Sequence, residues 1–222
     1  MINVLLDELP EEWETADGYT VKVNTDFRIG VQIALLQDDP DWTEQEKTMK
    51  IMELMFDGIP DLTPDEFQEC IQWFLGGWHH DNVVRKGDDT KLSDFDIDQW
   101  RIYAAFLAEY GIDLNNIEYL HYWAFMGLLS SLTDTAFTRV IEIRGRKVSK
   151  DMSKEDKKAL KEAKATYKLG RKLTYEEKAM EDDLYDFLGG NLDEEERHRL
   201  AKFEKYGEEE ATGQRDMTEQ SE

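Results

Sequence analysis

The stretch IDLNNIEYLHYWAFMGLLSSL, residues 112–132, decides how the chain folds, because it combines aromatic and apolar side chains at close spacing. A histidine, two tyrosines, a tryptophan and a phenylalanine stand within seven of its residues. Asn115, followed three residues later by Glu118, predicts the start of a helix. Side chains on one face of that helix recur at three- and four-residue spacing: Ile117, Leu120, Ala124, Gly127 and Leu128. Since aromatic residues dominate protein cores, we expect this stretch to be the packed centre of a helical domain.

The segments on either side are also predicted to be helical. Residues 97–110 carry an apolar repeat that ends before Gly111, which stands where a helix-terminating glycine belongs. Thr133-Asp134 predicts the cap of a further helix that runs to about Ile143. Together these segments predict the core residues Trp100, Tyr103, Phe106, Tyr110, Leu120, His121, Trp123, Phe125, Leu128 and Phe137.

The amino-terminal part is predicted to combine a short hairpin with three helices. Tyr19–Val23 alternates and predicts a strand, which we expect to pair with Asn3–Leu6, with Asp17-Gly18 favouring a turn. A helix is predicted from Phe27 to Gln37, with Asp26 as its cap. The capping boxes Thr43-Glu-Gln-Glu46 and Thr63-Pro-Asp-Glu66 predict two more helices, which run to about Phe56 and Leu75.

Charge divides the chain. Residues 1–143 carry 29 acidic and 9 basic residues, residues 144–178 carry 6 and 13, and residues 179–222 carry 15 and 5. We therefore predict a mainly α fold: a compact helical domain over 1–145 with a short amino-terminal β-hairpin, a charged helical extension over 146–206, and a disordered acidic tail over 207–222. Within the extension, helices are expected at 175–188 and 193–206.

The composition limits the partners. A formal net charge of −23 repels nucleic acid and anionic membranes, so we expect neither as a partner. The basic segment 144–178 keeps nucleic-acid contact open as an alternative to pairing with the acidic domain. No apolar run approaches the roughly 20 residues of a membrane span, and MINVLLDELPEEW lacks the basic region of a secretory signal. The single cysteine, Cys70, excludes an intramolecular disulfide, and we expect a soluble, cytoplasmic protein.

Candidate catalytic and metal-binding residues have simpler structural explanations. His121 has no paired base or nucleophile at useful spacing, so we expect it to bond a backbone or carboxylate group in the core. Adjacent histidines such as His79-His80 point about 100° apart on a helix and rarely bind one ion together. The aspartates Asp94, Asp96 and Asp98 lack the glycine and closing glutamate of a calcium loop. No glycine-rich phosphate loop is present, so we predict no catalytic residue, no metal and no cofactor.

Several motifs between residues 98 and 144 are more specific than this helical pattern. They are Tyr103-Ala-Ala-Phe106, Tyr110-Gly-Ile-Asp113, Leu120-His-Tyr-Trp123, Phe125, Leu128, Leu132, Thr135, Phe137 and Ile141-Glu-Ile-Arg144. Together with the amino-terminal LLDELPEEW and YTVKVNTDFRIGVQI, they resemble a family of small proteins from tailed phages and prophages of Gram-positive hosts. Members of that family are encoded between the major tail protein and the tape measure protein. The resemblance covers about residues 1–150.

The resemblance implies a tail assembly chaperone of the host bacterial cytoplasm. Such a protein is not an enzyme; it binds and solubilises the tape measure protein and helps to recruit major tail tube subunits during siphophage tail morphogenesis. A shorter companion chaperone or self-association stays open. The alternatives are a permanent structural tail component and an acidic DNA mimic that inhibits a host protein. For partner binding we predict apolar residues near helix ends: Met52, Met55, Trp73, Phe74 and Trp78.

Overall fold

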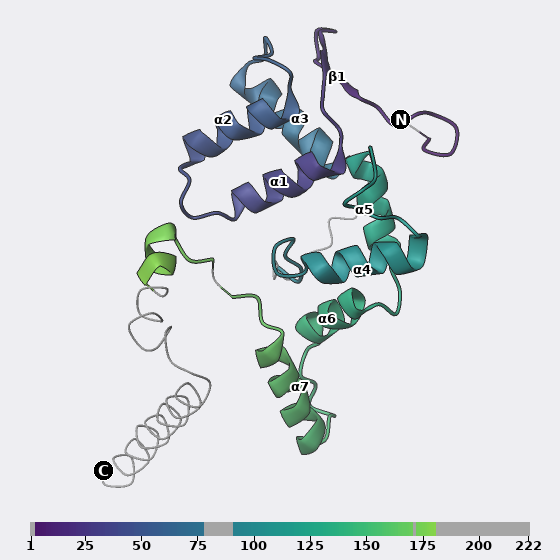
Figure 1. Ribbon diagram of the computed structural model, residues 1–222, viewed down its shortest axis with the longest axis vertical. Coiled ribbons are helices and arrows are strands. Elements are labelled where there is room, and N and C mark those ends of the chain that lie inside the picture. The colour runs from purple at the N-terminus through teal and green to yellow at the C-terminus, as the bar shows by residue number, and fades with distance from the viewer. Residues whose placement is uncertain (1–2, 78–90, 171, 181–222) are drawn as a thin grey trace. The chain divides into compact units, whose positions relative to one another are not determined.

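The computed structural model describes residues 3–77, 91–170 and 172–180 and is mainly α-helical, as predicted (Figure 1). A two-stranded antiparallel sheet precedes the helices. The elements are β1 (Glu12–Glu14), β2 (Thr20–Lys22), α1 (Phe27–Gln37), α2 (Glu44–Met55), α3 (Pro64–Gly76), α4 (Gln99–Tyr110), α5 (Tyr122–Ser131), α6 (Ala136–Gly145) and α7 (Lys154–Thr166). A further helical segment occupies residues 175–180.

The contacts within the chain divide it into two units, residues 1–172 and 173–222. The division therefore falls after Lys172, later than the boundary predicted at residue 145. All the named elements belong to the first unit. The predictions for Trp78, for His79-His80 and for residues 181–222 lie outside the described residues.

The predicted hairpin is present, but its first strand is a different segment. β1 and β2 pair antiparallel with Trp13 opposite Val21, and both side chains are buried. Gly18 has a left-handed φ of 88°, which explains why Asp17-Gly18 favours the turn between the strands. The predicted pairing of Asn3–Leu6 is wrong. Those residues form a turn of their own, because the short connection through Gly18 brings β1 directly opposite β2.

The starts of α1, α2 and α3 are confirmed. The Asp26 side chain accepts a hydrogen bond from the Arg28 backbone N–H at the start of α1. In α2 and α3 the predicted capping boxes are complete, because each cap threonine and the glutamate three residues later satisfy one another's backbone N–H groups. These local signals fix helix starts because they use only neighbouring residues.

The buried face of α4 differs from the predicted one. Ile102, Ala105 and Phe106 face the core, whereas Trp100 is 73% exposed. The prediction of Trp100 as a core residue is therefore wrong. Apolar side chains occur on more than one face of α4, and their spacing alone does not show which face is buried in the core. The other predicted core residues are buried or pack against the core: Tyr103, Phe106, Tyr110, Leu120, His121, Trp123, Phe125, Leu128 and Phe137.

The helix α5 begins later than the Asn115–Glu118 pattern predicts. Asp113 accepts a hydrogen bond from the Asn115 backbone N–H and closes a turn there instead. The helix starts at Tyr122, and its N-cap is His121, a residue type that the usual capping preferences do not favour. The cap of α6 is Thr135 rather than Thr133-Asp134.

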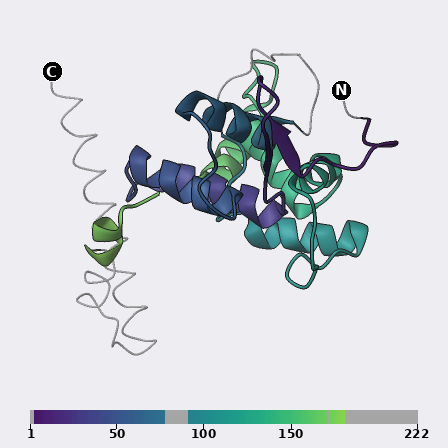
Figure 2. The ribbon, with the colours of Figure 1, turned by 90° about the horizontal axis from the view of Figure 1, so that it is seen from above.

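Within the first unit, which Figure 2 shows from above, α1 packs against α5. The Tyr122 backbone N–H donates to the Thr25 carbonyl at 2.7 Å, and the Phe27 N–H donates to the Leu120 carbonyl at 2.8 Å. Gly30 lies directly against the Tyr122 ring, so that a Cβ atom on Gly30 would come within 2.1 Å of it. The two helices therefore pack at a distance that only glycine allows at this position.

The helix α7 is fastened to the same unit through α6. The Arg144 guanidinium makes a two-pronged ion pair with the fully buried Asp98, with N–O distances of 2.6 and 3.1 Å. Its Nε donates to the Tyr167 carbonyl at 2.6 Å, just beyond the end of α7. Leu160 on α7 is buried. The first part of the predicted charged extension thus belongs to the compact unit.

Candidate functional site

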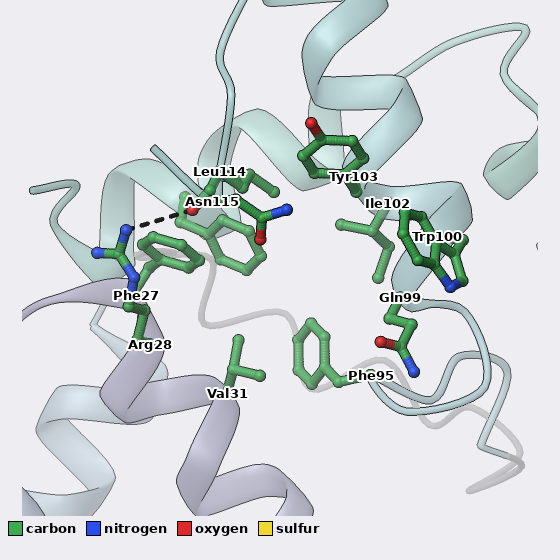
Figure 3. Close-up of a pocket in the computed structure, with 11 residues that line it drawn as sticks. Phe27, Arg28, Val31, Phe95, Gln99, Trp100, Ile102, Tyr103, Leu114 and Asn115 are labelled. Carbon is green, nitrogen blue, oxygen red and sulfur yellow. Dashed lines mark hydrogen bonds between the residues drawn. The ribbon is translucent and has the colours of Figure 1, made fainter. Parts of the chain in front are cut away.

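A groove between α1 and α4 is the candidate functional site (Figure 3). Its volume is about 440 Å³. Figure 3 shows Phe27 and Val31 on the α1 side and Phe95 and Ile102 on the opposite side of the hollow. The residues that line it are mostly apolar or aromatic: Phe27, Arg28, Val31, Phe95, Gln99, Trp100, Ile102, Tyr103, Leu114, Asn115 and Phe125.

The floor of the groove is part of the rigid core. The Phe125 ring stacks on the rings of Phe27 and Phe106, with centroid distances of 4.9 and 5.1 Å. Phe95 lies against the same ring at 6.2 Å. Because these rings support one another from three helices and a turn, the groove has a preformed apolar floor.

On α4, Trp100 and Tyr103 form one wall of the groove, and Leu107, which does not line the groove, continues their apolar stripe along the helix. Trp100 and Leu107 are 73% and 45% exposed, and Tyr103 between them is partly buried. The Trp100 and Tyr103 rings pack edge to face with centroids 6.0 Å apart. Aromatic residues of this kind are enriched at protein interfaces, where a partner covers them.

At the α1 end, Arg28 fixes the edge of the groove. Its guanidinium donates to the Leu114 carbonyl at 3.2 Å and to the Ile117 carbonyl at 2.7 Å, and the first of these bonds is drawn in Figure 3. It also pairs with Asp26 at 3.1 Å and lies over the Phe27 ring. Arg28 is therefore bonded within the protein and holds the segment before α5 against α1.

The residues predicted to bind a partner do not form one exposed surface in the structure. Met55 and Phe74 are fully buried, so the prediction that they form a surface is wrong. Met55 closes the core at the end of α2, and the Phe74 carbonyl accepts a hydrogen bond from the Trp123 indole at 2.8 Å. Met52 and Trp73 are partly buried and pack against the core, and Trp78 lies outside the described residues. The exposed Trp100, which the sequence pattern assigns to the core, is the surface residue that the prediction missed.

A second hollow of about 530 Å³ lies between α5 and α6. Its rim carries several polar groups, including Ser130, Thr138 and Glu142. Its apolar lining comes from Leu92, Met126, Leu129, Leu132, Phe137 and Ile141. The side chains of this lining are buried or partly buried, and no exposed tryptophan stands beside it in the described residues.

The buried polar groups of the first unit are bonded to one another. His121 accepts from the Trp123 backbone N–H through Nδ1 and contacts the Pro10 carbonyl through Nε2 at 3.0 Å, which confirms the backbone bond predicted for it. Asp98 accepts from Arg144 and Arg101. Burial raises the pKa of the Cys70 thiol to about 12, which keeps it protonated at neutral pH.

The aspartates before α4 have structural partners. Asp94 accepts from the backbone N–H groups of Asp96 and Ile97 and pairs with Lys91 at 2.7 Å. Within residues 3–77, 91–170 and 172–180, no three histidine, cysteine, aspartate or glutamate side chains are grouped so that they could hold a metal ion. In the same part of the chain, no helix has the length and apolar character needed to cross a membrane.

The fold and the groove define the class: an acidic, mainly α-helical protein with a preformed apolar groove at its surface. The sequence matches the family described as Bacteriophage Gp15 protein over residues 5–169, and the chain belongs to this family. The match runs from before the hairpin to beyond the end of α7. No curated protein and no solved structure matches the chain.

Proposed function

We propose that this phage protein is a tail assembly chaperone. In this proposal it acts in the cytoplasm of the host bacterium, binds and solubilises the tape measure protein, and helps to recruit major tail tube subunits during siphophage tail morphogenesis. The observation that carries the proposal is the apolar groove beside α4, with the exposed Trp100 on its wall, in a chain that belongs to a phage protein family.

The charge of the protein supports a solubilising role. A tape measure protein is long, apolar and helical, and a chaperone has to cover part of its surface while keeping the complex dissolved. The groove supplies apolar surface, and a net charge of −23 on the chain keeps complexes apart in solution. A binding role also fits the polar interior, because Asp98, Arg144 and His121 are occupied by structural bonds rather than facing the groove.

The direct test is co-expression with the tape measure protein encoded beside this chain, followed by pull-down and size exclusion. We expect the tape measure protein to be insoluble alone and soluble in a stoichiometric complex. Trp100→Ala should weaken the complex about 30-fold, as expected for the loss of an aromatic residue at the centre of an interface. Because Trp100 is largely exposed, the variant should retain its thermal unfolding midpoint.

The matched control is Trp42→Ala. Trp42 is also an exposed tryptophan, but it does not line the groove. It should bind as the unaltered chain does. A tape measure protein that stays insoluble with the unaltered chain would refute the chaperone proposal. Detection of the protein in purified virions would instead favour a permanent structural tail component, and displacement of DNA from a host protein would favour the acidic mimic.

A further inference from the structure

We infer that the groove beside α4 takes an amphipathic helix that carries basic residues at both ends of its apolar face. The inference rests on the proposed function for the groove itself and adds the chemistry of its occupant. It follows from two independent features of the described residues, the spacing of the exposed apolar side chains and the position of the carboxylates around them.

The spacing along α4 points to a helical occupant. Trp100 and Leu107 on α4 are 73% and 45% exposed and, with the partly buried Tyr103 between them, recur at intervals of three or four residues. Trp100 and Tyr103 line the groove, and Leu107, which does not line it, extends the same face of the helix. This stripe is separate from the face that α4 buries in the core. A stripe of this kind is the seam along which a second helix packs its own side chains at the same spacing. A 12-residue helix such as α4 is about 18 Å long, which matches about three turns of a partner.

Carboxylates stand at both ends of this stripe. Asp96 precedes α4, is exposed, and contacts the Gln99 amide that lines the groove. Asp113 follows α4 and interacts with the Tyr103 hydroxyl, which also lines the groove. The hydrogen bond from Asn116 lowers the pKa of Asp113, so this carboxylate is ionised at neutral pH.

Within the described residues, the two arginines in or next to the lining of the groove are already paired. Arg28 is bonded to Asp26 and to two backbone carbonyls, and Arg101 is bonded to Asp98. The carboxylates of Asp96 and Asp113 therefore set the sign of the potential at the two ends of the stripe. A helix with lysine or arginine at each end of its apolar face is complementary to this arrangement, and a helix with glutamate there is repelled.

The test uses the full chain and two synthetic peptides of about 18 residues with the same leucine spacing, one flanked by lysines and one by glutamates. Binding is measured by fluorescence anisotropy of the labelled peptide. At about 0.05 M salt, we expect the lysine-flanked peptide to bind at least about fivefold tighter. This preference should fall below about twofold at about 0.5 M salt, because salt screens exposed charges.

Two sets of variants assign the preference to the groove. Asp96→Asn combined with Asp113→Asn should remove most of the preference, and Trp100→Ala should weaken both peptides equally. Asp61→Asn combined with Glu69→Gln is the matched control, since it neutralises two exposed carboxylates that do not line the groove and so has the same net charge as the Asp96/Asp113 double variant. This control should keep the full preference.

The outcomes separate this inference from the proposed function. Equal binding of the two peptides, or tighter binding of the glutamate-flanked one, would overturn the inference about charge. Binding of neither peptide would overturn the inference that the occupant is a helix. Solubilisation of the tape measure protein is scored separately, so each of these results can occur while the chaperone proposal stands. A peptide preference without tape measure binding would support the inference and count against that proposal.

Discussion

The imidazole of His121 uses both of its ring nitrogens. Nδ1 accepts a hydrogen bond from the Trp123 backbone N–H at 3.0 Å and therefore carries no proton in this arrangement. The proton lies on Nε2, which donates to the Pro10 carbonyl at 3.0 Å. One side chain thus caps α5 and ties the segment before β1 to it, which explains why a histidine is found in the middle of an aromatic core.

Replacing His121 tests these two roles separately. His121→Ala should lower the free energy of unfolding by about 2–3 kcal/mol, because it removes the cap and the bond to Pro10. His121→Asn should cost about half as much, because an asparagine oxygen can still cap the helix. Urea denaturation measures both values. Equal losses in the two variants would show that the cap contributes nothing.

The lowered pKa of His121 also predicts that the free energy of unfolding depends on pH. Burial lowers the pKa of His121 in the folded protein, while the unfolded chain keeps the ordinary value of about 6.5. As the pH falls below that value, the unfolded chain binds the proton first, and the free energy of unfolding decreases. The contribution of neutral His121 to the free energy of unfolding is fully present above the pKa that His121 has in the unfolded chain. It is lost as the pH falls through the lower pKa that His121 has in the folded protein. Urea titrations from about pH 7.5 to 5.5 should show a smaller decrease in His121→Asn than in the unaltered chain.

At the scale of the elements, α1 and α5 approach each other so closely that position 30 has room only for glycine. Gly30→Ala should lower the free energy of unfolding by about 1–3 kcal/mol, because the new methyl group collides with the Tyr122 ring. Gly127→Ala is the matched control inside α5, where nothing lies within 4 Å of the added atom. It should raise the free energy of unfolding by about 0.5–1 kcal/mol through helix propensity. Chemical denaturation of both variants measures the two changes in the free energy of unfolding, which should have opposite signs.

The elements also show which parts of the fold can be predicted from the sequence. The starts of α2 and α3 are predictable, since Thr43 and Thr63 bond to residues three positions away. The register of the hairpin and the buried face of α4 depend on residues distant in sequence. Trp100 and Phe106 have similar apolar character, and packing against Phe125 decides that Phe106 is the buried one. For the same reason the groove could not be predicted, because its two walls lie about 70 residues apart along the chain.

At the scale of the whole molecule, the charge boundary and the structural boundary differ. The basic segment begins at Arg144, yet Arg144 is also the residue that holds Asp98 and the end of α7. A change in composition marks where the surface charge changes, whereas the limit of a compact unit depends on which apolar and polar groups are covered. Leu160 and the Tyr167 carbonyl place that limit beyond α7.

Two truncated chains test this boundary. A chain that ends at Lys172 should keep α7, while a chain that ends at Gly145 loses the burial of Leu160 and one partner of Arg144. We expect the shorter chain to be less stable by about 2–4 kcal/mol, from the lost apolar burial and hydrogen bond. Thermal unfolding of the two chains side by side measures the difference. Equal midpoints would place the boundary back at residue 145.

The pairing of Asp26 with Leu120 across 94 residues also sets an order of events during translation. Ribosomes in bacteria add about 5–20 residues per second, so α1 is made roughly 5–20 s before the segment that covers Gly30. During that interval α1 and the hairpin lack the long-range bonds that hold them to α5. The amino-terminal third of the nascent chain therefore completes its fold only when more than half of the protein has been synthesised.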